Sequence, residues 1–178
     1  MEELQKMSIT GIDGWVASAQ GRYVMAWEQE KINAVIADLF GYNALQLGLP
    51  KLDLLAQSRI LLRQTAGESG PVNLLCDLHE LPIANASVDL VVMPHVLEFN
   101  DDPHQILREV ERILIPDGQL VITGFNPPAA DMLGLSQATP LALDAVFAIE
   151  QGHLFDLARH PGQTLEVPLW SGLRLQVM

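Results

Sequence analysis

The sequence has a single cysteine, Cys76, so it can form neither an intrachain disulfide nor a cysteine-based metal site. No apolar run approaches the roughly 18 residues that a membrane-spanning helix needs. The opening residues, MEELQKMSITGIDG, are acidic and lack the apolar core of a signal peptide. These absences predict a cytoplasmic protein with no membrane partner.

Basic residues are also scarce, with 10 Lys and Arg against 22 Asp and Glu and a formal net charge of −12. Half of that excess lies in residues 77–112, which carry eight acidic and two basic residues. Such a charge argues against nucleic acid as the main partner, although Arg59 and Arg63 sit close together. A small-molecule ligand fits better, and the choice between a homo-oligomer and a partner protein stays open.

Several catalytic signatures are missing from the sequence. There is no Gly-x-Ser-x-Gly elbow, no P-loop and no Cys/His nucleophile pair. The histidines show no metal-ligand spacing, so we expect no metal site. The Gly-x-Gly-x-x-Gly turn with an acid about 20 residues further on, which a nicotinamide dinucleotide site requires, is absent too.

Hydrophobic residues make up 49% of the 178 residues, which is enough to form a buried core. This length favours one domain over 1–178, which we divide into an N-terminal helical segment (1–40), a core sheet (41–126) and a divergent C-terminal part (127–178). Apolar spacing and turn residues predict the elements. They are a helix over 22–40 ended by Gly41, strands at 44–47, 59–63, 72–76, 87–93 and 119–125, a short helix at 51–58, a loop at 64–71 and a helix over 140–159.

The clearest unit is strand, helix, strand over 87–125. Asp102 is a good N-cap, Pro103 suits the first helical position, and Gln105 completes a capping box for a helix within 100–118. Such a unit makes its strands parallel neighbours and predicts an open, doubly wound α/β sheet. Only eight residues separate 59–63 from 72–76, so either a crossover helix is missing or 59–63 is not a sheet strand. Near the end, Ser171-Gly172 joins two segments that predict a hairpin.

Ligands of such sheets bind beyond the carboxyl ends of the strands. Asp77 follows the third strand, where its carboxylate can accept from a ligand amine or simply cap a loop amide. His95 follows the most apolar strand and can act as a base or a structural histidine, with Glu98 three residues on. From the residues alone, both alternatives stay open at each position.

Residues 78–127, LHELPIANASVDLVVMPHVLEFNDDPHQILREVERILIPDGQLVITGFNP, resemble the central stretch of class I S-adenosylmethionine-dependent methyltransferases, and more narrowly their type 11 branch. Residues 27–53 resemble a bacterial subgroup of unassigned substrate. The resemblance implies a Rossmann-like, mostly parallel sheet with a terminal antiparallel hairpin, S-adenosylmethionine as cofactor, and methyl transfer to an acceptor.

The resemblance also implies cofactor-binding roles. The turn with Gln46, Gly48 and Leu49 would face the methionine and ribose part, Asp77 the adenine amine and Leu78 a ring nitrogen. Pro94 and His95 would border the methionine moiety and the substrate entrance, with His95 and Glu98 as candidate bases.

The sequence departs from the family pattern at two places where the family binds the cofactor. Gln46 and Pro50 replace an acid and a glycine of the first motif, and near the end of the second strand, where the family has an acid for the ribose hydroxyls, stand Arg63 and Gln64. We expect Glu68 to lie too far along the chain to take this role. Two functions follow: a methyltransferase for a small-molecule acceptor, or a non-catalytic protein of this fold that serves as a binding module or partner subunit.

Overall fold

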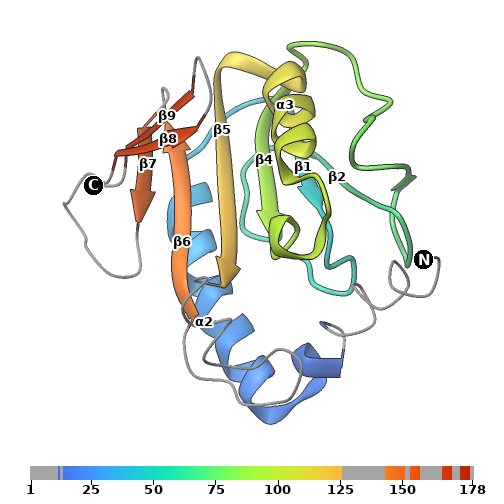
Figure 1. The fold of residues 1–178 in the computed structure, drawn as a ribbon, viewed down its shortest axis with the longest axis vertical. Helices are drawn as coiled ribbons and strands as arrows, with labels where there is room; N and C mark the ends of the chain where they lie inside the picture. Colours follow the sequence, from blue (N-terminus) through green and yellow to red (C-terminus); the bar gives the residue numbers. More distant parts are fainter. Residues whose placement is uncertain are drawn as a thin grey trace.

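The computed structural model of the chain describes residue 12, residues 14–125 and the backbone of 143–150, 153–156, 166–169 and 173–176. Seven strands form one sheet in the order β3-β2-β1-β4-β5-β6-β7 (Figure 1). They are β1 (Asn43–Leu47), β2 (Leu62–Gly67), β3 (Leu74–Leu75), β4 (Val88–Pro94), β5 (Leu114–Phe125), β6 (Leu143–Glu150) and β7 (His153–Asp156). Strands β1 to β5 pair in parallel, and β6 and β7 are antiparallel. The predicted fold class is confirmed.

The C-terminal helix predicted over 140–159 is wrong, because β6 and β7 occupy this segment. Its residues LDAVFAIE mix helix formers with Val, Phe and Ile, which favour strands, and pairing with β5 decides the outcome. The predicted hairpin is confirmed as β8 (Glu166–Leu169) and β9 (Leu173–Gln176). It forms a separate two-stranded sheet, whereas β6 and β7 supply the antiparallel end of the main sheet.

Helix α2 (Ala19–Ile36) begins at Ser18, whose side chain accepts a hydrogen bond from the Gly21 amide. The helix ends four residues before the predicted limit, so Gly41 is not its stop signal. A methyl group on Gly41 would lie 2.5 Å from the side chain of Asp89. The Asp89 carboxylate accepts hydrogen bonds from the amides of Tyr42 and Asn43, so a residue without a side chain at 41 lets β4 align the start of β1.

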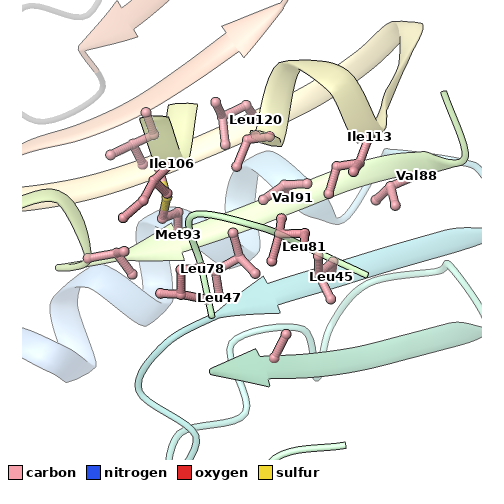
Figure 2. Packing of buried hydrophobic residues seen from close by; sticks show 14 residues of the cluster. Leu45, Leu47, Leu78, Leu81, Val88, Val91, Met93, Ile106, Ile113 and Leu120 are labelled. Atoms are coloured by element: carbon pink, nitrogen blue, oxygen red, sulfur yellow. The ribbon is translucent and has the colours of Figure 1, made fainter. Parts of the chain in front are cut away.

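Two apolar layers sandwich the sheet, and they follow from the alternation of side chains along each strand. Helix α3 (Pro103–Ile113) packs on one face over Leu45, Leu47, Val91 and Met93, as Figure 2 shows. Helix α2 covers the opposite face, where Ile32 and Ile36 meet the intervening residues Ala44, Leu90, Val92 and Val121. Each fully buried aliphatic side chain of these layers contributes roughly 1.5–3 kcal/mol of burial free energy.

Strand β2 lies further along the chain than predicted, and the short helix predicted over 51–58 is wrong, since this segment forms turns. Between β2 and β3 the chain has no helix. Six residues are enough to connect β2 to β3, because β3 begins opposite Ala66, one residue before the end of β2. The chain therefore runs back along β2 by only about one residue before it enters β3. An ordinary crossover returns along a whole strand.

Both ends of α3 are set locally. The Asp102 carboxylate accepts a hydrogen bond from the Gln105 amide at 3.1 Å, and Pro103 is the first helical residue, as predicted. The predicted reciprocal capping box is wrong, because the Gln105 side chain donates instead to the His79 carbonyl. The helix passes at Leu114 directly into β5, and a short 3-10 turn, η1 (Leu97–Phe99), precedes it. Within the described residues, no helix is long and apolar enough to cross a membrane.

Replacing Asp102 by Ala removes the cap of α3, and we expect the free energy of unfolding to fall by about 1 kcal/mol. Urea denaturation followed by circular dichroism measures this change. The neighbouring exposed Asp101 is the matched control, because its replacement by Ala leaves the cap in place. Equal losses in the two variants would contradict the capping role.

Candidate functional site

The carboxyl ends of the parallel strands β1 to β4 lie at one edge of the sheet, the edge where open α/β sheets bind ligands. Each strand delivers a different residue there. The turn at Gly48 follows β1, Glu68 follows β2, Asp77 follows β3 by two residues, and His95 follows β4. This edge is the candidate functional site.

Gln46 is 1% exposed, and hydrogen bonds inside the protein occupy its side-chain amide. Its Nε2 donates to the carbonyls of Gly48, Leu49 and Leu52 at 2.9–3.1 Å, and its Oε1 accepts from the Leu54 amide at 3.0 Å. Three carbonyls on one side and an N–H on the other fix the orientation of the amide. Gln46 therefore braces the turn from 48 to 54, and an acid at this position would have no hydrogen to donate to the three carbonyls.

The braced turn runs close to the end of β4. Gly48 and Leu49 have φ angles of +79° and +41°, and the Gly48 amide donates to the Ala66 carbonyl at 3.0 Å. A methyl group on Gly48 would lie 2.8 Å from Cγ2 of Val96. Glycine is therefore required here both by backbone conformation and by space.

Glu68 lies at this edge, which the sequence does not predict. A second strand at 59–63 would leave Glu68 too far along the chain, whereas β2 ends at Gly67 and Glu68 comes directly after it. Arg63 and Gln64 instead lie within β2, and Arg63 Nη1 donates to the carbonyls of Leu55 and Ala56. The acid expected at the end of the second strand is thus present.

Asp77 and His79 form a small turn beside Glu68. The Oδ1 atom of Asp77 accepts from the His79 amide and pairs with His79 Nδ1, both at 2.8 Å. The hydrogen bond from the His79 backbone, and then that from its ring, hold the pKa of Asp77 below its usual value. Ligand atoms of Glu68, Asp77 and His79 all lie within 4.8 Å of one another. Because Asp77 and His79 already bond each other, we assign no metal here.

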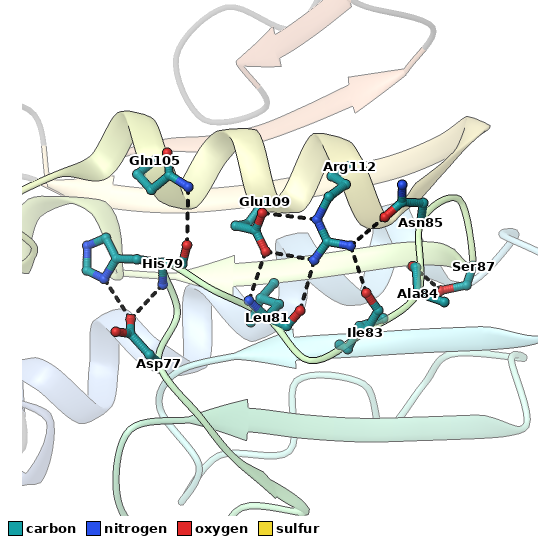
Figure 3. Close-up of polar contacts among 10 residues, drawn as sticks. All are labelled: Asp77, His79, Leu81, Ile83, Ala84, Asn85, Ser87, Gln105, Glu109 and Arg112. Carbon is teal, nitrogen blue, oxygen red and sulfur yellow. Dashed lines mark hydrogen bonds and ion pairs between the residues drawn. The ribbon is translucent and has the colours of Figure 1, made fainter.

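Helix α3 fastens the segment that contains Asp77, as Figure 3 shows. Gln105 donates to the His79 carbonyl, and the Glu109 carboxylate accepts from the Leu81 amide. Arg112 pairs with Glu109 at 2.7 Å, which lowers the pKa of that carboxyl. Its guanidinium also donates to the Leu81 and Ile83 carbonyls and to the Asn85 side chain. Leu78 is buried in the core below α3, so both polar and apolar contacts position this segment.

His95 lies in a buried network beyond β4, with its backbone in the left-handed region at φ +50°. Its Nε2 is 2.9 Å from Oε1 of Glu28 on α2, and the hydroxyl of Thr123 on β5 donates to the other oxygen of Glu28 at 3.2 Å. The Trp15 ring meets the imidazole edge-on, with ring centroids 6.3 Å apart. Glu28 was missed as a site residue. The sequence does hint at this position, because Glu28 lies four and eight residues before Ile32 and Ile36. That spacing puts its carboxylate on the buried face of α2.

The predicted site residues fall into three groups along this edge. Gln46, Gly48 and Leu49 form the braced turn, and Asp77 and Leu78 lie together beside Glu68. Pro94 ends β4 and directly precedes His95. The side chain of Glu98 lies outside the described part of the structure, so its role as a base stays a prediction.

This set of groups suits a nucleoside ligand. Glu68 offers acceptors for hydroxyl groups, and Oδ2 of Asp77 and the amide N–H of Leu78 have no hydrogen-bond partner among the described residues. An acceptor next to a donor on consecutive residues matches the amine and ring nitrogen of adenine. The residues present therefore fit an adenosine-containing cofactor.

Comparison with known proteins agrees with this fold. Residues 41–122 match the family described as a methyltransferase domain. A SAM-dependent methyltransferase from Thermotoga maritima has a TM-score of 0.52 at 16% identity, with 77% of this chain and 70% of that chain covered. The likeness to class I methyltransferases predicted from the sequence is confirmed.

Two curated relatives extend the comparison. The uncharacterised protein YafS of Escherichia coli is 29% identical over 136 residues, which are 75% of this chain and 56% of that protein. A malonyl-[acyl-carrier protein] O-methyltransferase of Hahella chejuensis is 40% identical over 107 residues, with 56% of this chain and 33% of that protein covered. The chain thus spans about half the length, or less, of these relatives.

Replacing Gln46 by Glu tests the brace. The carboxylate would face three carbonyl oxygens without a hydrogen to donate, and we expect a loss of about 3 kcal/mol in the free energy of unfolding. Urea denaturation measures the loss. The same change at Gln64, which is exposed on β2, should stay within about 0.5 kcal/mol. Similar values for the two variants would show that Gln46 does not brace the turn.

The Asp77–His79 turn should be visible in a pH titration. Because the pKa of Asp77 is lowered on folding, its contribution to stability is present above the ordinary carboxyl pKa and is lost as the pH falls through the lowered value. Carbonyl ¹³C NMR can follow this carboxyl. His79→Ala removes the ring contact and keeps the backbone bond, so the pKa should rise part of the way. An unchanged pKa in this variant would contradict the ring contact.

Proposed function

We propose that this chain, whose residues 41–122 match a methyltransferase domain family, binds S-adenosylmethionine and transfers its methyl group to a small-molecule acceptor. The observation that carries the proposal is the meeting of Glu68 and Asp77 beyond neighbouring strands. The family pattern has one acid there for the ribose and one for the adenine. The sequence alone suggested that the ribose acid was lost, and the altered boundary of β2 restores a candidate for it.

Each group of the site then has a task. The Glu68 carboxylate accepts from the ribose hydroxyls, Asp77 Oδ2 accepts from the adenine amine, and the Leu78 amide donates to a ring nitrogen. The Gly48 turn lies along the ribose and methionine part, and Pro94 borders the methionine end. The bound cofactor supplies an electrophilic methyl group on a sulfonium sulfur. The chain contributes mainly by holding the partners in line, which is the chief source of rate in such a transfer.

The acceptor side is less defined. The net charge of −12 favours a small or cationic acceptor over a nucleic acid. If the acceptor must lose a proton, His95 and Glu98 are the candidate bases, and the Glu28 carboxylate already holds the His95 ring. The acceptor, the oligomeric state and the cytoplasmic location all stay predictions.

A second function is favoured by the Gln46 brace. The first-motif acid is absent, and the amide in its place is used within the turn. A protein that kept the fold for its packing, as a binding module or partner subunit, would tolerate this change. Cofactor binding separates the two functions.

Isothermal titration calorimetry with S-adenosylmethionine and S-adenosylhomocysteine tests whether the chain binds the cofactor. We expect binding by the unaltered protein, and about ten- to a hundredfold weaker binding for Glu68→Gln and for Asp77→Ala, because hydrogen bonds to charged groups contribute roughly 1.5–3 kcal/mol. Glu80→Gln, at an exposed acid of the same segment, is the matched control and should bind normally.

An absence of heat and of any melting shift at millimolar ligand would reject the methyltransferase proposal and favour the non-catalytic alternative. Binding that survives in both Glu68→Gln and Asp77→Ala would leave a cofactor site but place it elsewhere.

A further inference from the structure

Glu28 is a carboxylate with 1% exposure, the most buried acid among the described residues. Removing a charge from water is costly unless it is paired and hydrogen-bonded. Both Glu28 oxygens have partners, His95 Nε2 on one and the Thr123 hydroxyl on the other. The network thus holds a buried carboxylate where α2 meets the sheet, and the proposed reaction uses it so far only to hold the His95 ring.

The place of this charge in the fold is specific. Glu28 continues the stripe of Ile32 and Ile36 on α2, one turn of the helix beyond the apolar cluster. There α2 meets the carboxyl ends of β4 and β5, because His95 directly follows β4 and Thr123 lies near the end of β5. The carboxylate therefore lies at the edge of the sheet that forms the candidate site, in contact with His95 and Thr123.

A charge is missing from the neighbouring strand. Gln46, on β1, pairs in register with Val92 of β4, two residues before Pro94. It is neutral, and its amide is occupied by the turn. The methionine end of S-adenosylmethionine carries an ammonium, a sulfonium and a carboxylate, so its net charge is positive. No carboxylate on β1 is available to offset this charge.

We propose that Glu28 supplies, through its network with His95 and Thr123, the negative charge that attracts the cationic methionine end of the cofactor. This inference rests on the proposed function and adds to it a residue from the N-terminal helix.

The hydrogen bonds define how the charge is held. A carboxylate accepts hydrogen bonds only, so His95 Nε2 and the Thr123 hydroxyl both carry their hydrogens toward Glu28. The carboxylate of Glu28 is the group that brings negative charge to this network. Its surroundings are buried, so its attraction for a nearby cation is screened far less than that of a surface carboxylate.

Three ligands with different charges test the proposal by calorimetry. S-adenosylmethionine has the sulfonium together with the ammonium and carboxylate of its amino acid, S-adenosylhomocysteine has only the ammonium and carboxylate, and 5′-methylthioadenosine has none of these groups. For Glu28→Gln, which keeps the shape and removes the charge, we expect S-adenosylmethionine to bind about tenfold more weakly. Binding of 5′-methylthioadenosine should change by less than about twofold. Either response of S-adenosylhomocysteine supports the proposal, since it tells which cation feels the charge.

Two further variants separate charge from structure. Glu30→Gln, an exposed position on the same helix, should leave all three affinities unchanged. Thr123→Val removes one hydrogen bond and keeps the charge, so any loss should be equal for the three ligands. If Glu28→Gln does not fold, Glu28→Asp withdraws the charge by one methylene, and it should weaken S-adenosylmethionine selectively.

Equal losses for all three ligands, or no loss for any, in the charge-altering variant would overturn the inference while leaving the methyltransferase proposal intact. A lack of binding of every ligand to the unaltered protein would instead defeat the proposed function, and this inference with it.

Discussion

The side-chain amide of Gln46 is the contact on which the cofactor edge depends. It ties the end of β1 to the backbone of the following turn through four hydrogen bonds, three given and one received. That arrangement positions Gly48 against Val96 and fixes the path of the chain toward β2. It also requires a neutral side chain, because a carboxylate cannot donate. The turn around Gln46 therefore suits the neutral side chain that departs from the family pattern, and the proposed cofactor would have to find negative charge on another element.

The parts of the fold that sequence predicted best are those with local signals. Asp102 and Pro103 mark the start of α3, and the continuous apolar run of β4 identifies a strand buried on both faces. The boundary of β2 could not be read in this way. Half of its residues LRQTAG are polar, and the first four are exposed or half-exposed at the side of the sheet where β3 is only two residues long. The apolar residues just before β2 instead favour a strand at 59–63.

The same reason explains what was missed in the site. Glu68 was excluded only because the strand boundary was placed four residues early. Glu28 resembles any acid on a helix, and only the contact with His95 and Thr123 distinguishes it, which no local pattern encodes. Asp77 and His95 could be proposed from the sequence because each closely follows a predicted strand. Residues adjacent to well-marked elements were predictable, and residues whose role arises from distant partners were not.

The Glu28 network has a consequence for the order of folding. Its partners are 67 and 95 residues further along the chain. During synthesis α2 is made first, yet the buried place for its carboxylate does not exist until β4 and β5 have been made and paired. Loop-closure entropy must be overcome before such distant contacts can stabilise the helix. Helix α2 is made before β4 and β5, and we therefore expect it to complete its packing late, at the edge of the sheet where the cofactor is proposed to bind.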